Sequence, residues 1–102
     1  MREVARPHAA GPSRRFAANL RRLRALADLS QEGLAFRAGM HRTQISLLES
    51  GERMPRVETL IKLAAGVGAA PNDLLEGIDW DPVTVVSGGL VITPEGRRGG
   101  RR

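Results

Sequence analysis

The sequence predicts a small all-α domain of five helices, followed by a β-hairpin or an extended arm. Apolar residues recur every three or four positions through most of residues 13–77, which is the period of an amphipathic helix. Glycines follow several of these segments, where helices commonly end. After residue 78 the pattern changes to short β-branched runs around a Gly-Gly turn. With 102 residues and 3% aromatics, the chain holds one domain with an aliphatic core.

The N-terminal segment is predicted to be an arm that leads into the first helix. Residues 1–12 include two prolines and have no apolar period, so we expect a flexible arm. Ser13 is the expected cap of a helix over residues 14–27. The apolar stripe of this helix consists of Phe16, Leu20, Leu23 and Ala27.

Two short helices with a tight connection follow. Ser30 precedes the first, at residues 31–38, and Gly39 is its expected left-handed terminator. The second begins at Arg42 and ends before Gly51. Since only about two residues separate them, the pair predicts a helix-turn-helix connection.

The last two helices are bounded by proline and glycine. Pro55 excludes a helix in the preceding loop, and the apolar period resumes at Val57 until Gly66 and Gly68 end it. Pro71 suits the first position of a final helix at residues 71–76, which Gly77 terminates.

Residues 78–94 are predicted to form a β-hairpin with strands at 83–86 and 90–93. Because an isolated hairpin is marginal in water, it must pack on the helices, through Trp80, or pair with another chain. It is therefore the candidate dimerisation element, and a disordered tail is the alternative. Residues 95–102 are rich in glycine and arginine and are predicted to be disordered.

The charge of the chain is unevenly distributed. The formal net charge is +5, and fifteen of the sixteen basic residues are arginines. Residues 1–29 hold seven arginines against two acidic residues, whereas residues 57–96 hold one lysine against six acidic residues. Arginine enrichment also arises from GC-rich codon usage, but a basic N-terminal half favours contact with a polyanion.

Composition also excludes several classes of protein. The chain has no cysteine and no apolar run near the roughly 20 residues that a membrane span needs, so we expect a cytoplasmic protein without membrane contact. Its two histidines, His8 and His41, have no neighbouring nucleophile and orienting carboxylate. We therefore expect no enzymatic activity, no metal and no cofactor.

A family resemblance lies in the predicted helix-turn-helix. The pattern Leu34, Ala35, Gly39, Ile45 and Leu48, followed by Glu49-Ser50-Gly51, resembles the Cro/cI-type (Xre family) repressors. The resemblance covers about residues 16–76 and implies a five-helix lambda-repressor-like DNA-binding domain at residues 13–77. Gly33 and His41 depart from the family pattern, since neither favours its helix.

The resemblance implies roles for particular residues. The second helix of the motif would read base edges in the major groove. The expected base contacts are Arg42, Thr43, Gln44 and Leu47; for Arg42 the alternative is a phosphate contact, and for Leu47 it is core packing. The expected phosphate contacts are Gln31, Arg37, Arg53 and Arg56; Arg37 is alternatively only solvated. Arg24 and Glu49 resemble the family's buried ion pair.

These observations predict a sequence-specific regulator of transcription, most simply a repressor. It would bind double-stranded DNA as a homodimer at an inverted repeat, with one reading helix in each half-site. Two alternatives remain: an antitoxin-like regulator, and an adaptor that has lost specific DNA reading. In both, the acidic C-terminal half would bind a protein partner.

Overall fold

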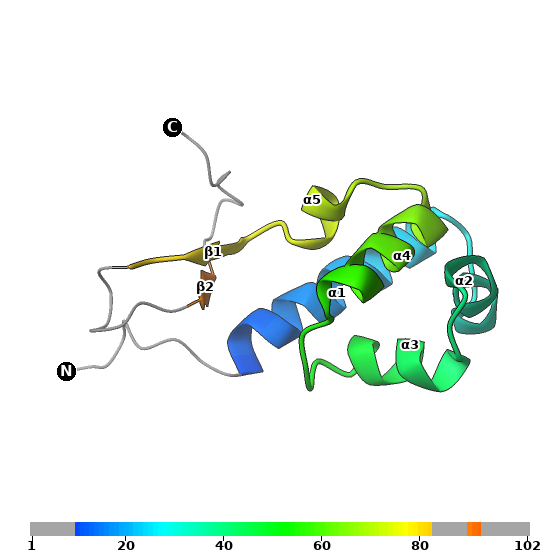
Figure 1. Cartoon of the computed structure of the whole chain (residues 1–102), viewed down its shortest axis with the longest axis horizontal. Helices are drawn as coiled ribbons and strands as arrows, with labels where there is room; N and C mark the ends of the chain where they lie inside the picture. Colours follow the sequence, from blue (N-terminus) through cyan, green and yellow to red (C-terminus); the bar gives the residue numbers. More distant parts are fainter. Residues whose placement is uncertain (1–9, 83–89, 93–102) are drawn as a thin grey trace.

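The computed structural model describes residues 10–82 and 90–92, which form five helices and a two-stranded antiparallel sheet (Figure 1). The predicted fold class, five helices with a C-terminal hairpin, is confirmed. The helices are α1 (Ala10–Leu26), α2 (Gln31–Ala38), α3 (Arg42–Glu49), α4 (Val57–Val67) and α5 (Pro71–Leu74), and the strands are β1 (Ile78–Trp80) and β2 (Leu90–Ile92).

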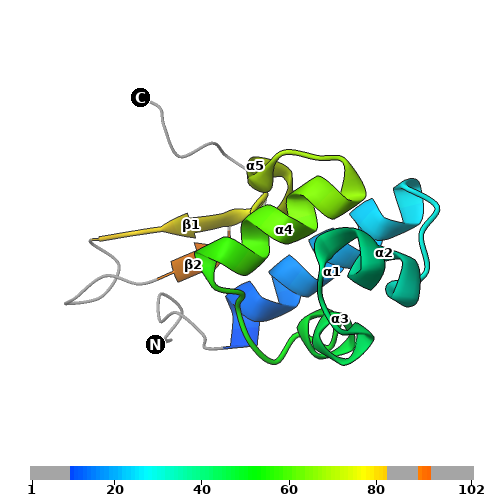
Figure 2. The ribbon, with the colours of Figure 1, turned by 45° about the vertical axis from the view of Figure 1, so that its right-hand side comes forward.

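The core draws at least one fully buried side chain from every helix. Its largest members are Phe16, Leu20, Leu34, Ile45, Leu63 and Leu74, each with no exposed surface. Helix α1 runs through the middle of the molecule, with α2 and α3 at one end and the hairpin at the other (Figures 1 and 2). Burial of this aliphatic face, rather than helix propensity, holds such short helices.

Helix α1 begins earlier than predicted. It starts at Ala10, so Ser13 lies inside the helix, 2% exposed, and is not its cap. Pro12 is compatible with this start, because the backbone N–H groups in the first turn of a helix have no carbonyl partner within the helix. The N–H that proline lacks is therefore not needed there. The start of α1 also packs against β2, a tertiary contact that the local sequence does not reveal (Figure 1). Residues 1–9 of the predicted arm lie outside the described residues.

The helix-turn-helix agrees with its predicted bounds. The Oγ of Ser30 accepts a hydrogen bond from the backbone N–H of Gly33 at 2.9 Å, and Gly39 has a φ of 68°. His41 precedes α3 and provides no side-chain cap bond. Its backbone N–H instead donates to Oε1 of Gln44 at 3.2 Å, so this helix is capped by a side chain from its own first turn.

Gly66 was predicted to break α4, but it is buried within the helix. A Cβ at this position would lie 2.6 Å from Cδ1 of Leu34, so the missing side chain lets α4 approach α2. Helix α4 ends at Gly68, whose φ is 74°. The helical period alone does not distinguish a glycine that ends a helix from one that permits close packing.

The C-terminal elements also differ from the prediction. Helix α5 ends at Leu74 rather than at residue 76. The carbonyls of Leu74 and Glu76 each accept a 2.9 Å hydrogen bond from Nδ2 of the buried Asn19, which joins this segment to α1. The first strand is Ile78–Trp80, paired Ile78 with Ile92 and Trp80 with Leu90. The strand predicted at 83–86 lies outside the described residues, as does the tail at 95–102.

Ile78, rather than Trp80, anchors the hairpin to the helices. Ile78 packs against the core, whereas Trp80 is 53% exposed. The predicted anchor is therefore wrong. Within residues 10–82 and 90–92, no helix is long and apolar enough to cross a membrane.

Candidate nucleic-acid interface

Helix α3 has a buried face and an exposed one. Ile45, Leu48 and Glu49 are buried, which places the helix firmly against α1 and α2. The side chains of Arg42, Thr43 and Gln44 in its first turn are exposed, and Leu47 is 39% exposed. Core packing, the alternative interpretation of Leu47, therefore does not hold, and an apolar side chain stands on the outer face of α3.

A buried ion pair fixes the C-terminal end of α3. Arg24 donates from Nε to Oε2 of Glu49 at 2.6 Å and from Nη2 to Oε1 at 3.0 Å, so the residues that the resemblance paired do form a bidentate ion pair. The Glu49 side chain is only 4% exposed. The hydrogen bond to Glu49 and its negative charge raise the pKa of Arg24 against the opposing effect of burial. The guanidinium of Arg24 therefore stays charged at every pH at which the protein is folded.

Two further bonds tie this end of α3 to its surroundings. Arg21 donates from Nη1 to the carbonyl oxygen of Glu49 at 2.6 Å. Arg24 donates from Nη1 to the carbonyl of Leu29 at 2.8 Å, which links α1, the loop before α2 and α3. A cation at the last carbonyls of a helix also suits the helix dipole. Arg21 is not among the site residues predicted from the sequence, although it lies one turn before Arg24 on the same helix.

Gln31 connects the ion pair to the exposed end of α3. Its Nε2 donates to Oε1 of Glu49 at 3.0 Å, and its Oε1 accepts from Nη1 of Arg42 at 3.3 Å. The side chain predicted to bind a phosphate is thus bonded at both ends within the protein. A phosphate contact by Gln31 stays a prediction.

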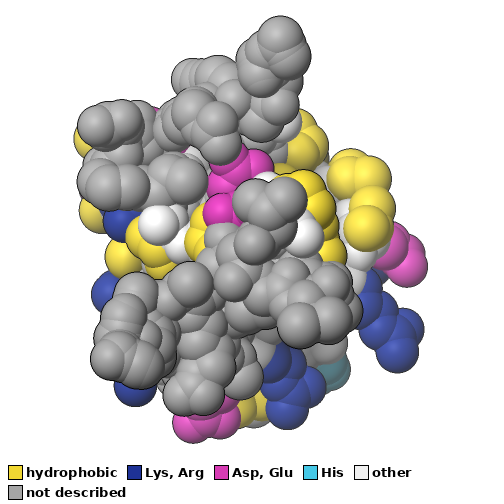
Figure 3. All heavy atoms as spheres, turned by 90° about the vertical axis from the view of Figure 1, so that its left-hand side faces the viewer, with side chains coloured by type: hydrophobic (Ala, Val, Ile, Leu, Met, Phe, Trp, Pro, Cys, Tyr) yellow, Lys and Arg dark blue, Asp and Glu magenta, His cyan; other side chains and the backbone are white. Residues whose placement is uncertain are grey.

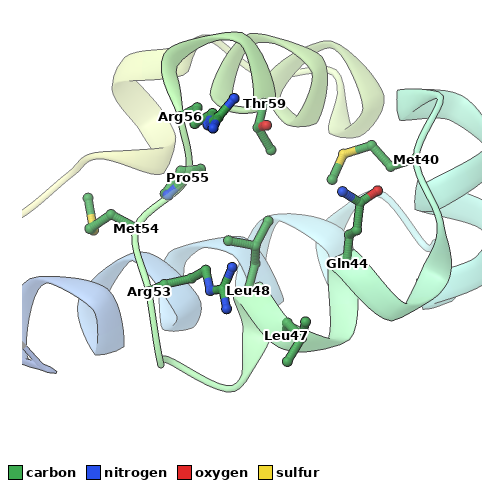
Figure 4. Close-up of a pocket in the computed structure, with 9 residues that line it drawn as sticks. All are labelled: Met40, Gln44, Leu47, Leu48, Arg53, Met54, Pro55, Arg56 and Thr59. Atoms are coloured by element: carbon green, nitrogen blue, oxygen red, sulfur yellow. The ribbon is translucent and has the colours of Figure 1, made fainter.

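A shallow groove of about 250 Å³ lies between α3 and the start of α4 (Figure 4). Gln44 and Leu48 point from α3 toward α4, and Leu47 lines the groove at its α3 edge (Figure 4). The loop between the two helices contributes Arg53 and Arg56, both exposed. Two cations therefore line the groove, Arg53 in the loop after α3 and Arg56 at the start of α4 (Figure 4).

Comparison with known proteins identifies the arrangement. A family model described as Helix-turn-helix matches residues 20–74, more than half of the chain. The chain belongs to this helix-turn-helix family. It is a DNA-binding transcriptional regulator, not an enzyme, and the Xre-type resemblance is confirmed.

Several helix-turn-helix relatives are control proteins. C.BamHI of Bacillus amyloliquefaciens is 37% identical over 62 residues, 60% of this chain and 76% of that protein. C.SmaI of Serratia marcescens is 42% identical over 60 residues, 59% and 71% of the two chains. The crystal structure of the restriction-modification controller protein C.AhdI from Aeromonas hydrophila matches with a TM-score of 0.58 at 35% identity, over 61% of this chain and 94% of that chain.

Two residues of the helix-turn-helix, Arg37 and Ser46, differ from the predicted set of site residues. Arg37 donates from Nε to the carbonyl of Gly66 at 2.7 Å, so it joins α2 to the last turn of α4; this bond favours a structural role over a phosphate contact. Ser46 lies one turn after Arg42 and is partly exposed. Ser46 is not among the predicted base contacts, although helical spacing alone places it near the face of Arg42 and Thr43.

Proposed function

We propose that the protein is a sequence-specific repressor that binds an inverted-repeat operator as a homodimer. Helix α3 lies in the major groove, where Arg42 pairs with guanine and Thr43 contacts a thymine methyl. Leu47 adds an apolar contact one turn later. The observation that carries the proposal is the exposed first turn of a family recognition helix whose other end is fixed by a buried ion pair.

Gln44 has a secondary part in this proposal. Bidentate pairing with adenine uses both ends of a glutamine amide. In this structure Oε1 of Gln44 already accepts the backbone N–H of His41, and the side chain points toward α4. Gln44 must therefore share or release its capping bond to read a base.

The phosphate contacts belong chiefly to the loop between α3 and α4. Arg53 and Arg56 are exposed along the groove between α3 and α4, and neither has a salt bridge within the described residues. Each neutralised phosphate releases counterions, so these contacts make binding salt-dependent without carrying sequence information.

Dimerisation is proposed to use the hairpin. Cross-strand partners share a face, so Ile78, Trp80, Leu90 and Ile92 lie on the same side of the sheet. Ile78 packs against the helical core, so only the part of this face formed by the other three is offered for pairing. Trp80, Leu90 and Ile92 are 53%, 37% and 39% exposed. Figure 3 shows hydrophobic side chains at the surface of this end of the molecule. An apolar sheet face beside open strand edges suits pairing across a two-fold axis.

Sedimentation of two double variants tests this interface. Trp80→Ser with Ile92→Ser is expected to dissociate the dimer. Val57→Ser with Ile61→Ser is the matched control, because these residues are 72% and 54% exposed on α4, apart from the hairpin. An unchanged dimer in the hairpin variant would remove the sheet face from the interface.

Selection from a random duplex library, with sequencing of the bound molecules, tests the whole proposal. We expect an inverted repeat with half-sites about one helical turn, roughly 10 base pairs, apart. Addition of the protein to a transcription reaction with this site across the promoter is then expected to reduce transcript. If no motif is enriched at moderate salt, an adaptor or antitoxin-like role with a protein partner becomes the better proposal.

A further inference from the structure

We infer that Arg15 and Asn19 of α1 are positioning residues that set the spacing between the two half-sites which the dimer accepts. They hold the junction between α5 and the hairpin, and so fix the dimerisation face relative to the reading helix. The inference rests on the proposed function, because it needs a dimer that forms through the hairpin. It adds a determinant of specificity that lies outside the reading helix.

The junction between α5 and β1 is a short non-helical segment that α1 holds. Helix α5 ends at Leu74, and β1 begins at Ile78. Nδ2 of Asn19 donates to the carbonyl oxygens of Leu74 and Glu76, both at 2.9 Å. Nε of Arg15 donates to the same Glu76 oxygen at 3.2 Å. Three hydrogen bonds from one helix therefore hold two carbonyls directly before the hairpin.

Burial and close packing restrict the junction to this position. Asn19 is 5% exposed, so a shift of the junction would leave its amide and the facing carbonyls unpaired inside the protein, which costs free energy. Gly77 has a φ of 86°, and a Cβ there would overlap the guanidinium of Arg15. Glycine thus permits both the turn into β1 and the close approach of Arg15 to the backbone.

The same helix also holds the reading helix. Arg21 and Arg24 donate hydrogen bonds to Glu49 at the C-terminal end of α3. The attachments to the hairpin and to α3 both lie within residues 15–24, about 14 Å of helix at a rise of 1.5 Å per residue. The hairpin and α3 lie at opposite ends of the molecule, with α1 between them (Figure 1). Helix α1 therefore connects the dimerisation face to the reading helix.

In a dimer, this connection determines which half-site spacing fits. Two-fold symmetry places an identical connection on each side of the paired hairpins, so the two connections together fix the separation of the two α3 helices. One extra base pair between half-sites moves one of them by about 3.4 Å and turns it by about 35° around the duplex. A protein whose junction is held cannot follow this change without breaking the bonds from α1, whereas a loosened junction can.

The test compares duplexes that carry the selected half-sites at different spacings. The selected spacing is compared with spacings one and two base pairs longer or shorter, and with a single half-site. The wild type is expected to prefer one spacing sharply. Arg15→Met keeps an unbranched side chain but removes the bond to Glu76, so it should reduce this preference about 3- to 10-fold, the range for one modest hydrogen bond.

Arg14→Met is the matched control. It removes the same charge from the neighbouring residue, which is exposed and packs beside Gly51 rather than Gly77. Both variants should lower the affinity for every duplex, the single half-site included, by a similar factor. Only Arg15→Met should also weaken the preference for one spacing.

Asn19→Ala tests the second positioning residue. It removes two hydrogen bonds and leaves the carbonyls of Leu74 and Glu76 without this donor, so it should broaden the accepted spacings further and lower the melting temperature. If this variant does not fold, Arg15→Met decides the question. Sedimentation should find both variants dimeric, because the apolar face of the hairpin is unchanged.

The outcomes separate the inference from the proposed function. An unchanged spacing preference in Arg15→Met would overturn the inference, and so would a wild type that binds all spacings alike. A uniform loss of affinity beyond that of Arg14→Met, with the spacing preference retained, would show a structural role only. Dissociation of Arg15→Met into monomers would overturn the inference as well. If the wild type selects no inverted repeat, the proposed function itself fails.

Discussion

The two ends of α3 differ sharply, although the helix has only eight residues, about two turns. At the C-terminal end the buried Glu49 carries bonds from Arg24, Arg21 and Gln31. At the N-terminal end the side chains are exposed, and the bonds of Arg42 and Gln44 are long and at the surface. A reading helix can thus be fixed at one end by buried bonds while the side chains at its other end stay exposed.

Substitutions at the two ends of α3 are expected to change different properties of the protein. A buried charge that loses its partner destabilises the fold strongly, whereas an exposed side chain contributes little to folding. Substitutions at the C-terminal end should therefore change stability, and those at the N-terminal end should change binding.

The largest effect is expected for Glu49→Ala. This change leaves Arg24 without its carboxylate partner inside the protein and should cost about 3 to 5 kcal/mol of unfolding free energy. Thermal unfolding followed by circular dichroism measures it. Glu52→Ala, three residues later on the exposed surface, is the control and should have little effect. Equal melting temperatures would show that the ion pair does not fix α3.

A smaller effect, on binding alone, is expected for Arg42→Ala. The loss of one bidentate base contact should reduce discrimination at a single base pair by about 1 to 3 kcal/mol. Affinities for the selected duplex and its point variants measure this change. The melting temperature should not change, since Arg42 is exposed. A uniform loss over all duplexes would instead identify Arg42 as a phosphate contact.

The bond from Arg21 to the end of α3 should be worth about 1 kcal/mol of stability, and Arg21→Ala would remove it. Arg22→Ala is the matched control on the same helix. Arg22 has only a 3.6 Å ion pair with Glu76, and both side chains are half exposed, so its removal should cost less than about 0.5 kcal/mol. Urea unfolding of both variants gives the comparison. Equal losses would mean that Arg21 adds nothing to the anchorage of α3.

The smallest effect is expected outside α3, for Arg53→Ala. Loss of one phosphate contact should reduce the slope of log affinity against log salt by about 0.9, with sequence preference retained. Binding titrations at several salt concentrations provide the slope. Lys62→Ala on α4 is the control, because Lys62 pairs with Glu58 there. A loss of sequence preference in Arg53→Ala would make Arg53 a base-reading residue.

Much of the helical framework was predictable because its signals are local. The bounds of α2 agree, since Ser30 and Gly39 act within a few residues of the ends they cap. The apolar period also located α4. The role of Gly66 within that helix depends on its close contact with Leu34 of α2, which the period does not show. The strand Ile78–Trp80 and its pairing with Leu90–Ile92 were not predicted, because strand pairing joins residues that local β propensity does not connect; the strand predicted at 83–86 lies outside the described residues.

The candidate site was predictable in its residues but not in its connections. The helical period placed Arg42 and Thr43 on the outer face of α3, and the family resemblance suggested the Arg24–Glu49 pair. The bonds that Gln31 makes to Glu49 and Arg42 join residues 11 and 18 positions apart. No local pattern reports such pairs, because they form only when the helices have packed.

The sequence by itself determined where most helices begin and end, which faces are apolar, and the helix-turn-helix pattern that marks the family. These properties follow from backbone preferences and from periods of a few residues. The tertiary structure alone decided that Gly66 is a packing site, that Arg37 joins α2 to α4, and that Gln31 links a buried ion pair to the reading residue. Such features depend on distances between segments far apart in the chain, which only the packed core fixes.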